Sequence, residues 1–305
     1  MHKIVLKKRG VSPVAAGHPW VFADSIDEFP PHAKVGDEVK LVAPDGNFLA
    51  WGLYSPHSMI RARLYSFDRD APFSRELLSA RIASAIALRE RVVRHDTDSC
   101  RLVFGEGDSL PGLLVDRYGD SIAVTFTTAP MAMRAEMVLE ILEELLAPAC
   151  VIALPDPSAE KKEKFRHPTG VLAGELPERL IATENGIRYV VDVESAQRKM
   201  LYFDQRENRA AVADNARGRM LDLYCYSGGF SLNCALSEST QEALAVDSSE
   251  GALKMLEANI AENEIEKGIF MLREDVSKAC RQLEAKGEVF DTVVLDPPAP
   301  GERAA

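Results

Sequence analysis

Acidic residues that follow apolar runs are the strongest chemical signal in this chain of 305 residues. Asp222 lies in MLDLY, Asp247 ends ALAVD, Asp275 follows IFMLRE and Asp296 ends VVLD. If each run is a strand of one parallel sheet, the carboxyl ends of the strands meet at one edge, where α/β proteins bind ligands. A carboxylate after the second strand, as at Asp247, can accept both hydroxyls of a ribose. The pattern therefore predicts a nucleoside site.

A glycine-containing turn follows Asp222. Tyr226, Ser227, Gly228 and Gly229 lead into a segment with helical character. Glycines let the backbone come close to a ligand, and a helix N-terminus favours a carboxylate or phosphate. The spacing is not the GxGxxG of dinucleotide enzymes, so we expect a nucleoside without phosphates, and S-adenosylmethionine (SAM) fits best. The alternative is a tight turn that binds nothing.

Two prolines follow Asp296. Proline fixes φ and leaves carbonyls outside any strand ladder, so Asp296 and Pro297 would form a rigid rim able to hold a flipped base beside a methyl donor. Asp275 stands where an adenine amino group could be met. Each acid alone could instead be a solvated loop residue, and the prolines could simply stop a strand.

The residues around these acids alternate between strand-like and helix-like segments. From about residue 187, apolar runs alternate with helices that begin at Gly229 and Ser249, and a third helix extends through Cys280. Such alternation is typical of a parallel, doubly wound sheet. For residues 181–305 we therefore expect an α/β domain whose strands end at the acids.

The preceding residues predict two smaller domains. Residues 1–70 contain short strand-like runs and a hairpin signal at Asp45-Gly46, which suggests a small β-barrel. Residues 71–180 predict a linker helix over 74–94, a hairpin at 118–120 and a helix opening near Pro130, as in a central α+β domain. The apolar positions expected to line the inner faces of these helices are Leu78, Ile82, Ala85 and Val92 in the first, and Met133, Met137, Ile141 and Leu145 in the second.

The net charge of −11 argues against a protein that holds nucleic acid by its overall field. In the first 70 residues, however, nine Lys and Arg exceed eight Asp and Glu, so if RNA is a partner this segment is where contact is expected, and the total charge does not decide the question. The candidate phosphate contacts are Lys7, Lys8, Arg9, Arg61 and Arg63. His18 and Trp20 could stack on a base. The alternatives are a solvated charged face and a Trp20 in the barrel core.

The five cysteines are scattered and form no CxxC pair. A disulfide framework or zinc site is therefore not expected, and a reduced cytoplasmic location fits. No apolar run approaches the ~18 residues of a membrane span, and the N-terminus does not look like a signal peptide. Cys225 lies in the turn after Asp222, but its neighbours are not cationic groups that would activate a thiol, so a packing role is favoured over a nucleophile.

Several motifs resemble one known family. GHPWVF (17–22), GEGDSLPGLLVDRYGD (105–120), DQRENR (204–209), DLYCYSGGF (222–230), ALAVD (243–247) and VVLDPPA (293–299) are similar, in order, to PUA-domain-containing class I SAM-dependent methyltransferases. That family forms 5-methylcytosine in 23S ribosomal RNA of the large subunit. The resemblance covers essentially the whole chain.

The resemblance implies roles for individual residues. Gln205 and Arg206 would close over the cofactor, while Asp222 and the turn through Gly228 and Gly229 would hold its methionine end. The ribose would be bound by Asp247, the adenine by Asp275, and the rim beside the methyl group would include Asp296. Lys199 and Met200 replace small residues that the family has near the cofactor entrance, which would weaken or alter binding.

The resemblance also implies a nucleophilic cysteine beyond Ala305, because none of the five cysteines occupies its position. We therefore expect a C-terminally truncated RNA methyltransferase with four of seven strands and impaired activity. An RNA-binding protein with a vestigial methyltransferase half is the alternative, and a nucleotide-dependent oxidoreductase is less favoured. Pairing of exposed sheet edges in a homodimer would be one physical resolution of an open sheet.

Overall fold

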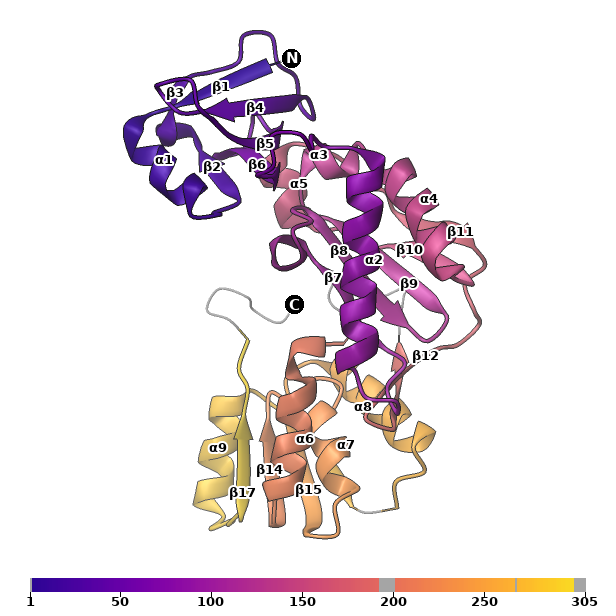
Figure 1. Ribbon diagram of the computed structural model, residues 1–305. Helices are drawn as coiled ribbons and strands as arrows, with labels where there is room; N and C mark the ends of the chain where they lie inside the picture. Colours follow the sequence, from indigo (N-terminus) through magenta and orange to yellow (C-terminus); the bar gives the residue numbers. More distant parts are fainter. Residues whose placement is uncertain (1, 192–200, 267, 299–305) are drawn as a thin grey trace. The chain divides into compact units, whose positions relative to one another are not determined.

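The computed structural model describes residues 2–191, 201–266 and 268–298 (Figure 1). The described chain forms two compact units. The first contains residues 2–93 and 99–178, and the second contains residues 94–98, 179–191 and the described residues from 201 onward. Among the described helices, none is both long enough and apolar enough to span a bilayer.

The first unit begins with a six-stranded sheet in the order β2-β6-β5-β4-β1-β3. Its strands are β1 (His2–Leu6), β2 (Trp20–Phe22), β3 (Ile26–Glu28), β4 (Glu38–Val42), β5 (Phe48–Tyr54) and β6 (Ile60–Ser66). The predicted hairpin at Asp45-Gly46 joins β4 to β5, with Gly46 at φ +85°. The sequence interpretation did not include helix α1 (Lys8–Ala15), which packs its buried Val14 into the core of this sheet.

The rest of the first unit is a five-stranded sheet in the order β11-β10-β9-β8-β7, packed with helices. Its elements are α2 (Arg75–Val92), β7 (Cys100–Phe104), β8 (Leu113–Tyr118), β9 (Ser121–Phe126), α3 (Ala129–Ala132), α4 (Ala135–Leu146), β10 (Cys150–Ala153), α5 (Pro157–Glu163) and β11 (Gly170–Gly174). The helix predicted over 74–94 is present as α2, and Ser74 caps it, because Leu77 N donates to Ser74 Oγ at 3.1 Å. Val92, expected on the inner face of α2, is exposed instead.

A helix opens near Pro130 as predicted, but the prediction that it continues unbroken through Met133 is wrong. The chain forms two helices, α3 and α4, with a break at Met133 and Arg134. The Arg134 guanidinium donates to the carbonyl of Pro130 at 2.8 Å and to that of Gly36 at 2.9 Å, which fixes the break. Met133, which was expected on the inner face, lies at the break and is 66% exposed. The residues of α4 that are buried are Val138, Ile141 and Leu142.

Besides the bond from Arg134 to Gly36, polar contacts of Arg63 and Trp20 join the two sheets of the first unit. Arg63 on β6 forms a 2.9 Å ion pair with Glu163 on α5, and both side chains are buried. Trp20 Nε1 donates to Glu106 Oε1 at 2.7 Å. A buried charge needs a partner, so these contacts hold the two sheets in one unit.

The second unit contains a four-stranded parallel sheet in the order β16-β15-β14-β17, as the alternating pattern predicted. Its elements are α6 (Arg206–Asn215), β14 (Gly218–Leu223), α7 (Gly229–Ala235), β15 (Thr240–Asp247), α8 (Glu250–Glu262), β16 (Ile269–Arg273), α9 (Val276–Ala285) and β17 (Thr292–Leu295). Helices α6 and α7 cover one face of the sheet, and α9 packs against the other (Figure 1).

A hairpin outside this sheet was only half predicted. Its strands are β12 (Leu180–Glu184) and β13 (Ile187–Val191), of which the sequence indicated the second. Asn185 and Gly186 form its turn with φ values of 51° and 78°, the left-handed conformation that two-residue hairpin turns require. The hairpin lies against α8, where Val190 N donates to Asn259 Oδ1 at 2.7 Å.

Candidate functional site

The carboxyl edge of the parallel sheet collects three of the predicted acids. Asp222 is 1% exposed, and its Oδ2 accepts hydrogen bonds from Ser231 N at 3.1 Å and Ser231 Oγ at 2.7 Å. Its Oδ1 is also buried, but has no hydrogen-bond partner among the described residues. Burial, opposed by the Ser231 bonds and aided by the charges of Asp296 and Asp247, raises the pKa of Asp222 to about 6. The buried, unpartnered Oδ1 of an ionised Asp222 is suited to accept a hydrogen bond from a cationic donor.

The turn after Asp222 is strained. Tyr224 and Tyr226 have φ values of 64° and 50°, a conformation that side chains other than glycine adopt at a cost. Gly228 has φ +83°, and a Cβ there would overlap the buried Leu256 side chain. Such strain is typically kept where a backbone must receive a ligand.

Asp247 holds this turn in place. Its Oδ2 accepts from Tyr226 N at 3.0 Å, and its Oδ1 accepts from Ser249 N at 2.8 Å. Each carboxylate oxygen has a second lone pair, so Asp247 can still accept hydroxyl groups. The residue therefore fits both as a support for the turn and as a ribose ligand.

The rim residue Asp296 lies next to the DQRENR motif. Gln205 Nε2 donates to Asp296 Oδ2 at 3.1 Å, which brings together two residues predicted for the same site. Burial and the charge of Asp204 raise the pKa of Asp296, while Arg209 lowers it in part. Arg206 instead forms a 2.9 Å ion pair with its neighbour Glu207.

Asp275 has a different environment from the other acids. It is exposed at the start of α9, where its Oδ1 accepts from Lys278 N at 3.0 Å as a helix cap. It follows β16, which lies next to β15 in the sheet. Lys199 and Met200, predicted near the cofactor entrance, lie outside the described residues.

The two cysteines nearest the turn, Cys225 and Cys234, do not provide an activated thiol. Cys225 is 5% exposed, and burial, together with the charges of Asp222 and Asp247, raises the pKa of its thiol far above the usual value. A protonated thiol is a weak nucleophile, so Cys225 is a packing residue. Cys234 is buried with its pKa raised to about 12, also chiefly by burial. Within the described residues, no group of three His, Cys, Asp or Glu side chains could hold a metal ion.

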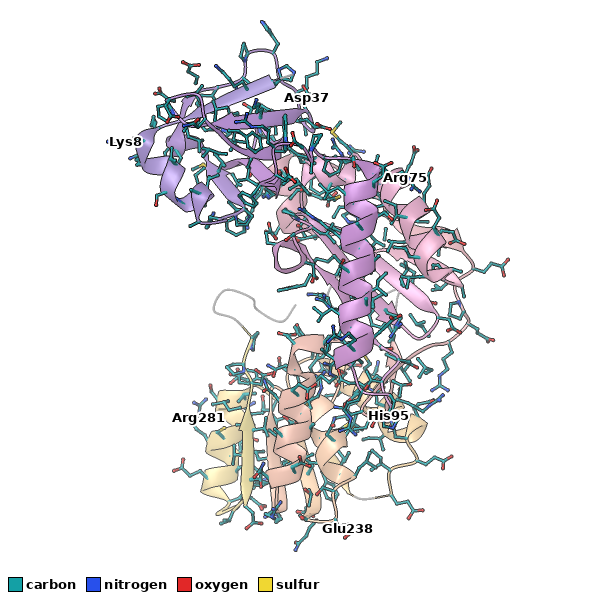
Figure 2. All side chains as sticks on the ribbon, viewed as in Figure 1. Lys8, Asp37, Arg75, His95, Glu238 and Arg281 are labelled. Atoms are coloured by element: carbon teal, nitrogen blue, oxygen red, sulfur yellow. The ribbon has the colours of Figure 1, made fainter. Side chains whose placement is uncertain are left out.

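The five basic residues predicted to contact RNA fall into different environments. Lys8 is exposed on α1 (Figure 2), and Lys7 and Arg9 are exposed while donating to the Asp24 carbonyl at 3.0 and 2.8 Å. The guanidinium of Arg61 holds the carbonyl groups of the 56–58 loop. Arg63 is buried in its ion pair with Glu163, which indicates a structural role instead of a contact with RNA.

A small cavity in the first sheet includes Gly10, which follows Arg9 directly, but none of these five basic residues lines it. It has a volume of about 250 Å³ and is formed by α1 and the chain around β2. His18 and Trp20, predicted to stack on a base, contact each other edge to face at its wall with ring centroids 5.9 Å apart. Trp20 is half-buried, which leaves part of its ring accessible.

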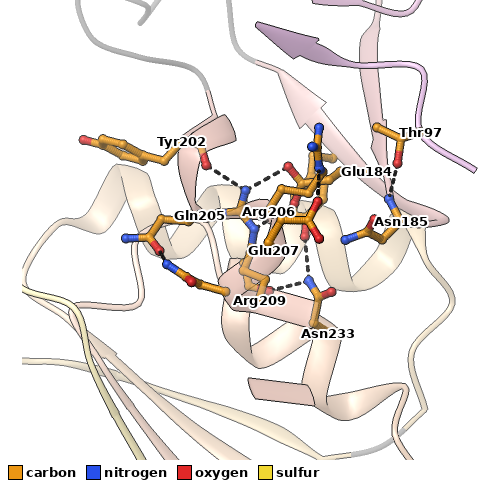
Figure 3. Close-up of polar contacts among 12 residues, drawn as sticks. Thr97, Glu184, Asn185, Tyr202, Gln205, Arg206, Glu207, Arg209 and Asn233 are labelled. Atoms are coloured by element: carbon orange, nitrogen blue, oxygen red, sulfur yellow. Dashed lines mark hydrogen bonds and ion pairs between the residues drawn. The ribbon is translucent and has the colours of Figure 1, made fainter. Parts of the chain in front are cut away.

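Four buried polar residues near the turn at residues 224–229 were not predicted. Figure 3 shows Arg209, Glu184 and Asn233 in this group, and Asn259 is the fourth. Arg209 belongs to the DQRENR motif, and Glu184 occupies an inward position of the alternating strand LIATE. An acid at an inward strand position was the available signal, because a buried carboxylate requires a partner.

The parallel sheet, the strained turn and the acid after the second strand define the fold of class I methyltransferases. A Streptococcus mutans protein described as a SAM-dependent methyltransferase is similar with a TM-score of 0.83 and 18% identity, over 98% of this chain and 77% of its own. A methyltransferase structure complexed with SAH has a TM-score of 0.85 and 18% identity, over the same shares. At this identity the similarity establishes the fold alone.

The similarity in sequence identifies a family, which the similarity in fold does not. A family described as a PUA-like domain matches residues 4–67, and one described as conserved hypothetical protein 95 matches residues 170–303. Ribosomal RNA large subunit methyltransferase I of Tolumonas auensis is 33% identical over 99% of this chain and 77% of its own length. Its namesake from Alteromonas mediterranea is 35% identical over 92% of this chain and 71% of its own length. The chain belongs to the ribosomal RNA large subunit methyltransferase I family, and the predicted fold class is confirmed.

Proposed function

We propose that this chain binds SAM at the carboxyl edge of β14, β15 and β17 and takes part in methylation of ribosomal RNA. The observation that carries the proposal is the buried Oδ1 of Asp222, which lacks a partner among the described residues and lies beside a strained turn. An ammonium group, such as that of a methionine moiety, would satisfy it. Bound SAM supplies an electrophilic methyl group.

Different residues of the chain would bind different parts of SAM. Asp222 and the turn at Ser227 and Gly228 would hold the methionine end, and Asp247 would accept the ribose hydroxyls. Asp275 would meet the adenine. The Gln205 amide orients Asp296 at the rim, where Pro297 keeps the backbone extended against a substrate base.

RNA would be recognised by the first unit. Lys7, Lys8 and Arg9 on and before α1 offer exposed cations for phosphate groups. The neighbouring cavity, lined by His18 and Trp20, has an aromatic wall on which an unpaired base could stack. The family name of the relatives points to large-subunit ribosomal RNA as the substrate.

The finer proposal concerns the product, 5-methylcytosine, which rests on the family resemblance. Its formation requires a thiolate that attacks carbon 6 of cytosine. Of the five cysteines, Cys225 is the one in the turn, and its thiol is buried with a raised pKa. We therefore expect the 305-residue chain to bind SAM and RNA but to transfer methyl groups to cytosine slowly.

Calorimetric titration with SAM, using NAD as control ligand, tests the cofactor. We expect micromolar binding of SAM, roughly −8 kcal/mol, and none of NAD. Asp247→Ala should weaken SAM binding at least tenfold, whereas Glu242→Gln, on the same strand, should not. If the chain unfolds cooperatively but does not bind SAM, the proposal is overturned. RNA binding by the first unit would then be the remaining function.

Transfer of labelled methyl from SAM to 23S ribosomal RNA, followed by nucleoside analysis, tests the product. A low yield of 5-methylcytosine is the expected result. Label in a different nucleoside would refute the cytosine assignment while keeping the RNA methyltransferase. Rapid formation of 5-methylcytosine would contradict the expected impairment.

A further inference from the structure

The hairpin β12–β13 lies outside the parallel sheet, yet three buried side chains connect it with residues 224–229, the turn proposed to bind the cofactor. These side chains are Arg209 on α6, Asn233 on α7 and Asn259 on α8. None of the three was predicted to bind the cofactor. Their connections indicate that the hairpin supports the turn rather than merely joining it to the preceding chain.

Arg209 makes the strongest of these connections (Figure 3). Its Nε donates to Glu184 Oε1 at 2.8 Å and its Nη2 to Glu184 Oε2 at 2.9 Å, with both residues at most 4% exposed. Nη2 also donates to the carbonyl of Tyr202 at 2.8 Å. Burial lowers the pKa of Arg209, but the hydrogen bonds and charge of Glu184 outweigh it and raise the pKa overall, so the guanidinium stays charged.

The same guanidinium lies under the start of α7. A Cβ added to Gly229 would come within 2.8 Å of Arg209 Cδ, so the glycine is required for this close packing. From the other side, Asn233 Nδ2 donates to the Gly229 carbonyl at 2.7 Å and to Tyr189 of the hairpin at 3.0 Å.

Asn259 holds the middle of the turn. This fully buried side chain donates from Nδ2 to the Ser227 carbonyl at 3.0 Å and accepts from Val190 N of the hairpin at 2.7 Å. The backbone of residues 227–229 is therefore bonded to, or packed against, side chains that are themselves fixed by the hairpin.

Arg209 influences the predicted site without being one of its surface groups. The Tyr202 backbone that it holds carries a ring in edge-to-face contact with Tyr226, with centroids 5.7 Å apart. Its charge also lowers the pKa of Asp296, against the larger effects of burial and Asp204.

We propose that Arg209, paired with Glu184, is a positioning residue that sets the conformation of the turn at 224–229 and of residues 202–205. SAM affinity then depends on a hairpin outside the sheet. This inference rests on the proposed function for its ligand, but the positioning itself is a property of the free protein.

A double substitution tests the proposal. Arg209→Met alone leaves the Glu184 charge buried and unpaired, which destabilises the fold for reasons unrelated to SAM. Arg209→Met with Glu184→Met removes both charges and keeps apolar packing, a replacement that buried ion pairs often tolerate. The double variant is expected to unfold near the wild-type temperature, yet to bind SAM at least tenfold more weakly by calorimetry.

Hydrogen exchange without SAM supplies an independent measurement. Amides of residues 202–205 and 226–229 should exchange at least tenfold faster in the double variant than in the wild type. The matched control is Arg219→Met with Glu242→Met, a half-buried pair on β14 and β15 that should change neither measurement. Wild-type exchange and affinity in the Arg209 and Glu184 double variant would overturn the inference. Faster exchange in a chain whose wild type does not bind SAM would overturn only the cofactor assignment.

Discussion

The carboxyl group of Asp222 is buried while one of its oxygens has no partner among the described residues. Its pKa of about 6, raised mainly by burial, means that the neutral acid is favoured more strongly in the folded state than in the unfolded chain. Stability from this group is therefore present below about pH 4 and is lost as the pH rises through about 6. A rise from 3.8 to about 6 corresponds to roughly 3 kcal/mol at most.

Asp222→Asn removes this ionisation. We expect the variant to unfold at a higher temperature than the wild type at pH 7.5, with the difference shrinking towards pH 4.5. Thermal unfolding at the two pH values measures it. A difference that is the same at both would contradict the raised pKa. SAM binding should be weakened in the same variant, because the neutral amide cannot pair with an ammonium group.

Thiol accessibility gives a second prediction for single residues. Four cysteines are buried and only Cys280 is partly exposed, so one thiol of the native protein should react rapidly with a disulfide reagent. Cys280→Ser should abolish the fast phase, and Cys225→Ser should leave it unchanged. A fast phase lost in the Cys225 variant would show that this thiol is accessible after all.

At the level of elements, the turn between β14 and α7 is expected to reject any side chain at Gly228. Gly228→Ala combines a φ of +83° with overlap against buried Leu256, and should cost about 3 kcal/mol or more. Gly46→Ala, in the turn between β4 and β5, has nearly the same φ but open space, and should cost about 1 kcal/mol. Urea unfolding of the two variants compares them, and equal costs would argue against the overlap.

The elements that could be predicted were those with local signals. Apolar runs and a glycine turn indicated the parallel sheet and placed Asp222, Asp247 and Asp296 at one edge. The break between α3 and α4 could not be found this way, because Arg134 is held by a carbonyl 98 residues away. The pairing of Glu184 with Arg209 likewise depends on a contact across 25 residues that no periodicity encodes.

At the scale of the whole chain, its two compact units should unfold in separate transitions. Glu163→Gln leaves the buried Arg63 without its close counter-ion, and should lower the stability of the first unit by about 3 kcal/mol. The transition of the second unit should not move. Calorimetric unfolding resolves the two.

Glu144→Gln is the control for that measurement. It breaks an ion pair with Arg75 in the same unit, but both side chains are exposed and such pairs contribute little. The transition of the first unit should therefore stay in place. If both variants shifted it equally, burial of the Arg63 pair would not be what stabilises the unit.

The hairpin β12–β13 also has a consequence for where the domains of this protein can recombine in evolution. A recombination that joined the sheet to a new N-terminal domain at residue 201 would leave Arg209, Asn233 and Asn259 without their hairpin partners. A crossover before residue 179 would carry those partners along and lose the contacts of residues 94–98 with the hairpin, such as the bond from Asn185 N to Thr97 Oγ1 at 2.9 Å. The family match over residues 170–303 includes the hairpin. Exchange of domains among relatives should therefore respect the earlier boundary, and hairpin and sheet should pass together between genomes.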